Sequence, residues 1–286
     1  MHLSLLLHTG ARLSLTEFTV HPSTVIGIAG LAGLYEWGVR RWGDAAITSS
    51  PGPGRPAAQR PNRPPFYAAL AIMFLSLNGW LHDLSDYYLF SAHMVQHLVL
   101  ALAVAPLLVM GTPGWLLRPA LAVRGVAPVG RWVTHPIHAF TIFNVVVAGW
   151  HLPPLYNTAM AHHSVHIIQH LTLLVASVLM WWPVLSPLPE LPRVSYPAQM
   201  LYLFLMSIPM SLVSITIVYA KTILYPAYSS APRVWGISPM SDQMAGGLIM
   251  WIPGGLYFFV IISVVFFRWQ QRDGAESVAA AQAVQR

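Results

Sequence analysis

The sequence predicts an all-α fold: a polytopic membrane helix bundle of about seven transmembrane helices, with the N-terminus outside and the C-terminus in the cytoplasm. The first observation is composition, because 56% of the residues are hydrophobic and only 8% are charged, with a mean hydropathy of +0.57. A soluble domain carries roughly 25% charged residues. So little charge excludes a water-facing surface of ordinary size, and lipid must surround most of the chain.

The second observation is a series of apolar segments of membrane-spanning length. A helix crosses the hydrocarbon layer in about 20 residues. Backbone polar groups in lipid must be bonded within the segment, so these segments are expected to be helices. The predicted spans, of which the fourth is the shortest, are residues 22–39, 66–81, 90–111, 136–151, 163–183, 197–219 and 243–267.

The third observation is the placement of positive charge, which sets the orientation. Cytoplasmic loops of membrane proteins hold the excess of Arg and Lys. Twelve of the fifteen basic residues lie in four segments that fall on one side of seven spans. The opposite side keeps only Arg12, Lys221 and Arg233. The net charge of +6 is therefore a topology signal, and no basic stripe interleaved with aromatic residues indicates binding to nucleic acid.

These spans imply a simple domain organisation. Residues 1–19 are expected to form an extracytoplasmic tail, and they lack the pattern of a cleaved signal peptide. Residues 20–268 form the seven-helix transmembrane domain, which includes a cytoplasmic loop at 40–65 that is rich in Pro and Arg. Residues 269–286 form a polar cytoplasmic tail.

Histidine is the residue type that indicates function. The chain has thirteen His and no Cys, so a metal site must use His, Met, carboxylates or backbone atoms. Imidazole suits copper, zinc, iron and nickel. Ionisable residues inside membrane spans are costly, and they therefore point to a functional site.

The spacing of the histidines predicts one metal site. The third span reads HMVQH, which places His93 and His97 four residues apart. The fifth reads HHSVHIIQH, in which His166 and His170 are four apart and His163 lies on the same stripe. Residues with this spacing share one helix face. If the two faces meet, four or five imidazoles converge, with His151 nearby at the outer end of the fourth span. A single His near a helix end is more often an interfacial hydrogen-bonding residue.

Other candidate ligands have competing interpretations. Asp242, at the outer start of the seventh span, could bind a metal or orient a His, or it could be a carboxylate favoured at a helix N-terminus. The pairs Met206/Met210 and Met240/Met244 offer thioethers that favour Cu(I), but Met more often fills gaps between helices. No GxSxG, Walker or HExxH motif is present, so we do not expect an enzyme.

Three segments resemble the bacterial CtaG family of caa3-type cytochrome c oxidase assembly factors. They are FSAHMVQHLVLALAVAPLLVMGTP (90–113), WHLPPLYNTAMAHHSVHIIQHLTLLVASVLMWWPV (150–184) and SDQMAGGLIMWIPGG (241–255). The resemblance extends over roughly residues 65–268. It implies a seven-helix protein of the bacterial plasma membrane that delivers copper to the oxidase. An unrelated single-span copper chaperone of the same name uses Cys ligands, and its mechanism cannot apply to a chain without Cys.

Together, the resemblance and the residue pattern predict copper held at an extracytoplasmic His-rich site. The implied partners are membrane lipid and the oxidase subunits that carry copper centres, with no nucleic acid. The expected ligands are His93, His97, His166 and His170, with His163, His151 and Asp242 as a second tier.

Two other functions remain open from the sequence. A haem-binding electron-transfer or quinone-reducing membrane protein would also use two His from different helices of a bundle, for example His93 with His166. A metal transporter with a midplane site would be expected to show internal inverted repeats, and the sequence shows none.

Overall fold

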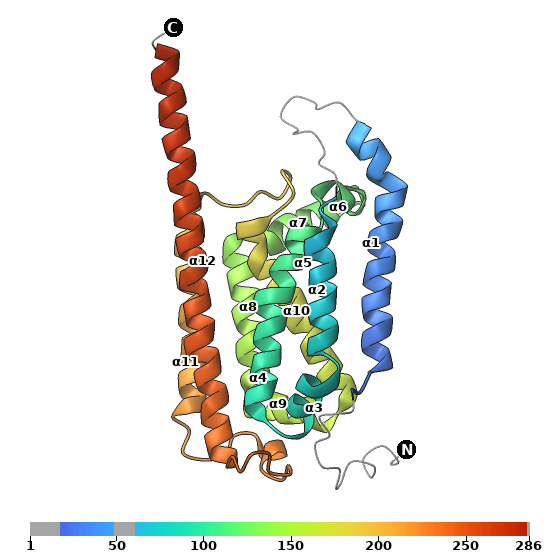
Figure 1. Ribbon diagram of the computed structural model, residues 1–286, viewed down its shortest axis with the longest axis vertical. Helices are drawn as coiled ribbons and strands as arrows, with labels where there is room; N and C mark the ends of the chain where they lie inside the picture. The colour runs from blue at the N-terminus through green and yellow to red at the C-terminus, as the bar shows by residue number, and fades with distance from the viewer. Residues whose placement is uncertain (1–17, 49–60, 285–286) are drawn as a thin grey trace.

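Every regular element that the structure describes is a helix, which confirms the predicted all-α class. The computed structural model describes residues 18–48 and 61–284, shown in Figure 1. Residues 1–17, 49–60 and 285–286, which include most of the predicted outer tail and part of the predicted loop 40–65, lie outside the described residues. In order, the helices are α1 (Pro22–Thr48), α2 (Arg63–Ser76), α3 (Gly79–Tyr87), α4 (Phe90–Leu98), the π-helix η1 (Val99–Val104), α5 (Ala105–Gly111), α6 (Gly114–Leu121), α7 (Val126–Thr134), α8 (Pro136–His151), α9 (Pro153–Ala161), α10 (His163–Leu185), α11 (Tyr196–Val218), the 3-10 helix η2 (Pro226–Tyr228) and α12 (Pro239–Val284).

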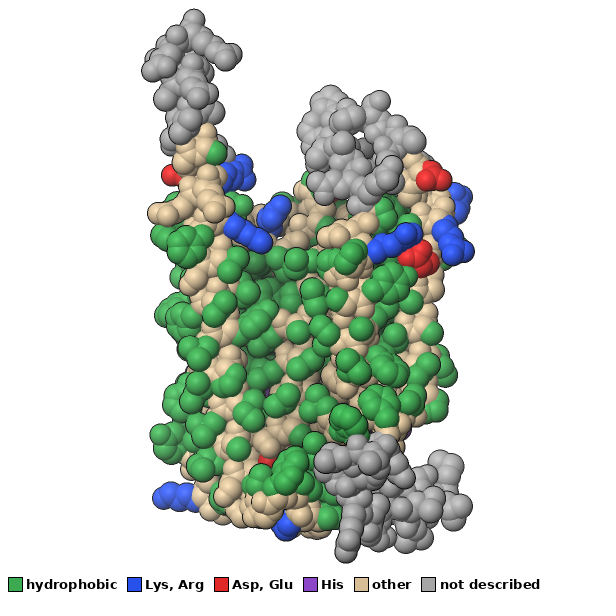
Figure 2. Space-filling view, in the orientation of Figure 1, with side chains coloured by type: hydrophobic (Ala, Val, Ile, Leu, Met, Phe, Trp, Pro, Cys, Tyr) green, Lys and Arg blue, Asp and Glu red, His purple; other side chains and the backbone are tan. Residues whose placement is uncertain are grey.

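The distribution of polarity identifies a membrane protein. Large apolar side chains such as Leu171, Leu212 and Val260 are more than half exposed, whereas His93, Gln96 and other polar side chains are fully buried. On the face shown in Figure 2, apolar side chains cover the middle of the molecule, and Lys and Arg lie toward its two ends. More of these side chains gather at the upper end, where α2 and α11 begin, than at the lower end. An apolar exterior around an interior that contains buried polar side chains is stable only when lipid replaces water as the solvent.

Fewer helices than the seven predicted spans are both long enough and apolar enough to count as membrane spans by length and hydropathy. Among residues 18–48 and 61–284, four helical segments are long and apolar enough to cross a membrane: Phe90–Gly111, α10, α11 and Pro239–Ala275 of α12. The pair α2 and α3, bent by 48°, makes a fifth if it is one broken span. The other two predicted spans are also helices, but α8 has only 16 residues and α1 is less apolar.

Two helix boundaries differ from the prediction for local reasons. The predicted span 66–81 breaks after Ser76 and turns into α3, because Gly79 adopts a φ of +62° and its missing Cβ leaves room for the Phe18 ring. The predicted tail 269–286 instead continues α12 as far as Val284. Its AESVAAAQAV sequence is rich in residues with high helix propensity.

A π-helical turn interrupts the span that carries His93 and His97. Pro106 has no N–H, so the carbonyls four and five residues before it need other donors. Tyr257 of α12 donates its hydroxyl to the Leu102 carbonyl at 2.6 Å, and the Trp181 indole of α10 donates to the Ala101 carbonyl at 2.8 Å. The irregular turn is therefore bonded to the two neighbouring helices, and it fixes their positions relative to α4.

Replacement of Trp181 by Phe tests this bond. The substitution keeps an aromatic ring but leaves a buried carbonyl without its donor, so we expect it to lower the free energy of unfolding by about 1–3 kcal/mol. Unfolding in mild detergent measures the change. Trp132→Phe, at an exposed position, is the matched control and should have little effect. Equal loss in the two variants would contradict the proposed role of the indole donor.

Candidate metal centre

Four histidines from two helices meet inside the bundle. His93 and His97 lie one turn apart on α4, and His166 and His170 lie one turn apart on α10. The ring centroids of His93 and His166 are 5.4 Å apart, and those of His97 and His170 are 5.2 Å apart. Both helices begin at the same end of the molecule (Figure 1), so the two i, i+4 pairs reach the same depth. The structure thus brings together the four imidazoles that the spacing predicted.

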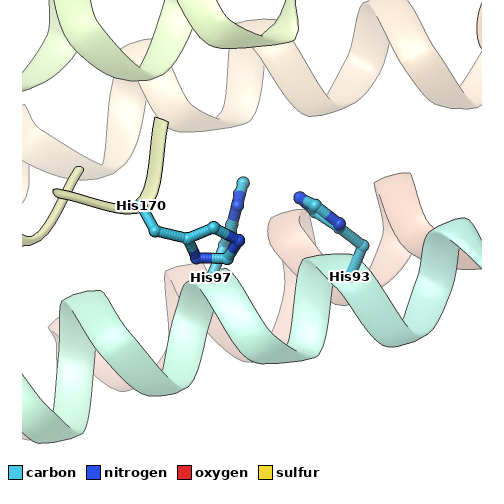
Figure 3. Close-up of side chains that lie close together, drawn as sticks. All are labelled: His93, His97 and His170. Carbon is cyan, nitrogen blue, oxygen red and sulfur yellow. The ribbon is translucent and has the colours of Figure 1, made fainter. Parts of the chain in front are cut away.

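Two groups of side chains have the geometry to hold a metal ion. The first consists of His93, His97 and His170, whose ligand atoms all lie within 4.8 Å of one another. Figure 3 shows the two α4 rings and the His170 ring directed toward a common space. The second consists of Asp86, His93 and His166, again within 4.8 Å. The groups share His93, so they form two adjacent positions in one cluster.

The buried nitrogens of this cluster lack hydrogen-bond partners. Both ring nitrogens of His93 and of His97, and Nδ1 of His170, have no partner among the described residues. His93 is fully buried and His97 is 6% exposed. Buried polar atoms in proteins are nearly always bonded, and exceptions point to a functional role or an ion. Imidazole lone pairs that converge in this way are suited to a metal such as copper or zinc.

One hydrogen bond within the cluster limits which lone pairs are free. His166 Nε2 and His170 Nε2 are 2.8 Å apart. One of these nitrogens must carry a proton and donate it to the other. Neither Nε2 atom therefore offers a free lone pair to a metal while this bond persists, and the neutral ring that donates keeps its lone pair on Nδ1.

The carboxylate of Asp86 enters the cluster from α3. Its Oδ2 lies 3.4 Å from His166 Nδ1 and 3.4 Å from His82 Nε2. The Ser85 hydroxyl lies within hydrogen-bond distance of the other oxygen, at 2.9 Å. A carboxylate beside an imidazole orients the ring and raises its basicity as a ligand. Asp86 falls between the predicted spans 66–81 and 90–111, so the sequence does not mark it as a candidate ligand. His82 and Asp86 are four residues apart, and they share a face because α3 is a helix.

Two glutamines occupy matching positions next to the histidines. Both helices carry the pattern H-x-x-Q-H, with Gln96 on α4 and Gln169 on α10, and both side chains are fully buried. Gln96 Nε2 donates to the Ser76 carbonyl at 2.6 Å and lies 3.2 Å from His82 Nδ1. The Gln169 amide has no partner among the described residues. Gln96 thus links α4 to the bend between α2 and α3.

The structure separates the remaining predicted residues from the four-histidine cluster. His163 is exposed at the start of α10 and belongs to neither ligand group. Asp242 accepts hydrogen bonds from the backbone N–H groups of Phe90 and Ser91, at 2.6 and 3.1 Å, so it caps α4 rather than facing the imidazoles. His151 also lies outside both groups, with its ring centroid 6.1 Å from that of His97.

The methionines expected as packing residues differ in how deeply they are buried. Met206 is fully buried, and its sulfur accepts a hydrogen bond from Asn144 at 3.6 Å. Met240 and Met244 are 36% and 45% exposed at the start of α12. Met210 is buried and lines a cavity beside His97 and His151.

The chain is similar in sequence to proteins of three mycobacteria. The chain is 28% identical over 201 residues to an uncharacterized protein of Mycobacterium bovis and to one of Mycobacterium tuberculosis, and 24% identical to one of Mycobacterium leprae. Each match covers 65% of this chain and 30% of the relative, so the chain spans about a third of the length of these curated relatives. No solved structure matches the chain.

The family model described as cytochrome c oxidase caa3 assembly factor (Caa3_CtaG) matches residues 33–272. This range contains every helix of the His cluster, its capping residue Asp242 and the π-helical turn. The chain therefore belongs to the Caa3_CtaG family of caa3 cytochrome c oxidase assembly factors.

Proposed function

We propose that this protein is a membrane assembly factor that binds copper at the His cluster and delivers it to cytochrome c oxidase. Family membership supports the oxidase as the partner. The observation that supports a metal is the set of buried, unpartnered imidazole nitrogens on α4 and α10. On this proposal the protein is a carrier and not an enzyme, it lies in the bacterial plasma membrane, and it contacts the oxidase subunits that contain copper centres.

The ligands suit a carrier, because imidazoles and a carboxylate can release the metal that they bind. Neutral imidazoles and one carboxylate bind copper without the thiolates that would hold it more tightly. Since the two ligand groups share His93, an ion can change partners while it keeps one bond. Copper binding would also supply the bonds that the buried nitrogens lack, and metal binding of this kind stabilises the folded protein.

The cavity beside His97, within the part of the chain that the structure describes, is too small for haem. The cavity that touches His97 has a volume of only about 30 Å³. Pockets for cofactor-sized ligands take roughly 300–1,000 Å³. The His93 and His166 rings are also nearly parallel, at 17°, with the ring centroids 5.4 Å apart. The two rings therefore stack on each other and leave no space for a porphyrin between them. The geometry around the cluster therefore favours a single metal ion over a porphyrin.

The proposal places the His cluster near the outer face. It keeps seven crossings, with α1, the α2–α3 pair and α8 as spans in addition to the four long ones, the N-terminus outside and the C-terminus in the cytoplasm. The support is the charge asymmetry between the two ends in Figure 2, because cytoplasmic segments hold the excess of Lys and Arg.

Single cysteines introduced into this Cys-free chain test the orientation. Ser195 precedes α11 and Ser230 lies between α11 and α12, and both are exposed. We expect Ser195→Cys to react with a membrane-impermeant thiol reagent only after the cells are opened, and Ser230→Cys to react in intact cells. The reverse pattern would put the His cluster on the cytoplasmic side.

Loss of two opposed imidazoles tests the metal site. The double variant His97→Ala, His170→Ala removes two of the three ligands of one group, so we expect purified protein to retain little copper. A single substitution should only lower the occupancy, because neighbouring His side chains remain.

Copper retention should also fall as the pH is lowered, because protons compete with the metal for the imidazoles.

The matched control for copper retention is His138→Ala. His138 lies at the opposite end of the bundle, where its Nδ1 is 2.7 Å from the Trp132 carbonyl oxygen. Metal analysis should find copper at the wild-type amount in this variant, and size-exclusion chromatography should show that all variants remain monodisperse. Wild-type copper in the double variant, or equal loss in His138→Ala, would refute the site.

Deletion of the gene tests the assembly role. We expect lower activity of the caa3-type oxidase while its subunits are still synthesised, because the defect lies in metal insertion. Added copper should partly restore activity, since metal at high concentration can reach the oxidase without a carrier. Full oxidase activity and copper content in the deletion strain at low copper would exclude this function.

A further inference from the structure

A small cavity borders the His cluster at His97, which belongs to both. Its walls include His97 and His151, and three methionines from three different helices: Met94, Met210 and Met250. Its volume is about 30 Å³. One water-sized sphere needs roughly 10–15 Å³ on the same kind of measure, so the cavity can accept a single ion and nothing much larger.

His151 is held with a lone pair directed into this region. Its Nδ1 lies 2.6 Å from the Val147 carbonyl oxygen, which can only accept, so Nδ1 carries the proton. Its Nε2 lies 3.4 Å from the Met94 sulfur. A thioether cannot donate a hydrogen bond, and a charged ring among these apolar walls would carry a large desolvation cost. The Nε2 lone pair of this buried ring therefore has no donor.

The hydrogen bond from Nδ1 is the one that metal-binding histidines usually make. Their second ring nitrogen commonly donates to a carbonyl or a carboxylate, which fixes the tautomer and the ring orientation. His97, on the opposite wall, has no partner for either ring nitrogen and is 6% exposed. The cavity is thus lined by two imidazoles and by thioethers, the soft donors that select Cu(I).

We propose that this cavity is a second metal site that takes Cu(I), with His151 and Met94 as ligands and with Met210 and His97 completing the set. The choice of copper rests on the proposed function. The site differs from the outer groups because its walls add His151 and the sulfur atoms of three methionines. His97 stands between the two, with its ring centroid 5.2 Å from that of His170 and 6.1 Å from that of His151.

The alternative is that the three methionines only pack. Buried Met often fills irregular gaps between helices, and Met94 is fully buried in the main hydrophobic cluster. Packing alone, however, does not explain why the Nε2 lone pair of His151 faces a sulfur atom rather than a hydrogen-bond donor. It also predicts no sulfur ligand on bound copper.

Purified wild-type protein and variants loaded with Cu(I) without oxygen provide the test. The variants are the double substitution Met94→Leu, Met210→Leu, and the control Met73→Leu. Met73 is also buried, but it belongs to a separate hydrophobic cluster on α2. Exchange of Met for Leu keeps the side-chain volume nearly constant. X-ray absorption at the copper edge reports sulfur ligands, and competition with bathocuproine disulfonate reports Cu(I) affinity.

We expect a copper–sulfur contribution in the wild type and in Met73→Leu, and its loss in the double Met variant. Cu(I) retention in that variant should weaken by at least about tenfold, since even the loss of supporting residues around a metal lowers affinity by roughly 10–100-fold. An unchanged copper–sulfur signal, or equal loss in Met73→Leu, would overturn the second site. His166→Ala with His170→Ala should leave the copper–sulfur signal in place.

The two proposals fail in different ways. If the His166/His170 variant loses copper while the double Met variant keeps its full Cu(I) affinity, the outer site stands and the cavity site is wrong. If the double Met variant loses Cu(I) while the His166/His170 variant keeps the wild-type copper content, the cavity site stands and the outer one is wrong.

Discussion

The burial of several imidazoles without hydrogen-bond partners is the constraint on which the arrangement of this bundle depends. Each buried, unpartnered polar atom costs about 1–3 kcal/mol, and five ring nitrogens of three histidines are in this state. The rest of the fold must hold them in place against that cost. Asp242 fixes the start of α4 from α12, and Gly246 of α12 lets the Phe90 ring pack closely against it. A ligand that bonds these nitrogens would recover part of the cost.

Hydrogen bonds from the connection between α11 and α12 also fix the end of the cluster that lies beside α3. The Tyr228 hydroxyl donates to the Ser85 carbonyl at 2.7 Å, and it lies 2.8 Å from the hydroxyl of Tyr156, whose ring packs edge-on against His93. Tyr228 belongs to η2, so the connection between α11 and α12 reaches over α3 and secures it. Asp86 on α3 therefore faces the imidazoles because elements far apart in the sequence hold α3 in position.

The sequence was sufficient for features that depend on local periodicity. It predicted the helices and the two His pairs, because i, i+4 spacing determines which side chains share a helix face. It did not mark Asp86, which falls between two predicted spans and approaches the histidines only because the chain bends at Gly79 and continues as α3. The capping of α4 by Asp242 and the π-helical turn depend on side chains from distant helices, which no local pattern shows. His163 satisfies the spacing, yet at the first residue of α10 it lies outside the packed part of the bundle. The count of spans stays a proposal, because α1 and α8 are short or weakly apolar.

On the proposed function, the types of donor atom change from one candidate metal position to the next. One group combines the Asp86 carboxylate with two imidazoles, the other brings three imidazoles together, and the cavity beside His97 adds thioethers. His93 belongs to both groups, and His97 belongs to the second group and borders the cavity. Harder oxygen donors favour oxidised or hydrated ions, whereas thioethers favour Cu(I). Because neighbouring positions share a ligand, an ion can move between them without losing all its bonds at once. On the proposed function, shared histidines would therefore permit exchange between positions that are buried inside the bundle.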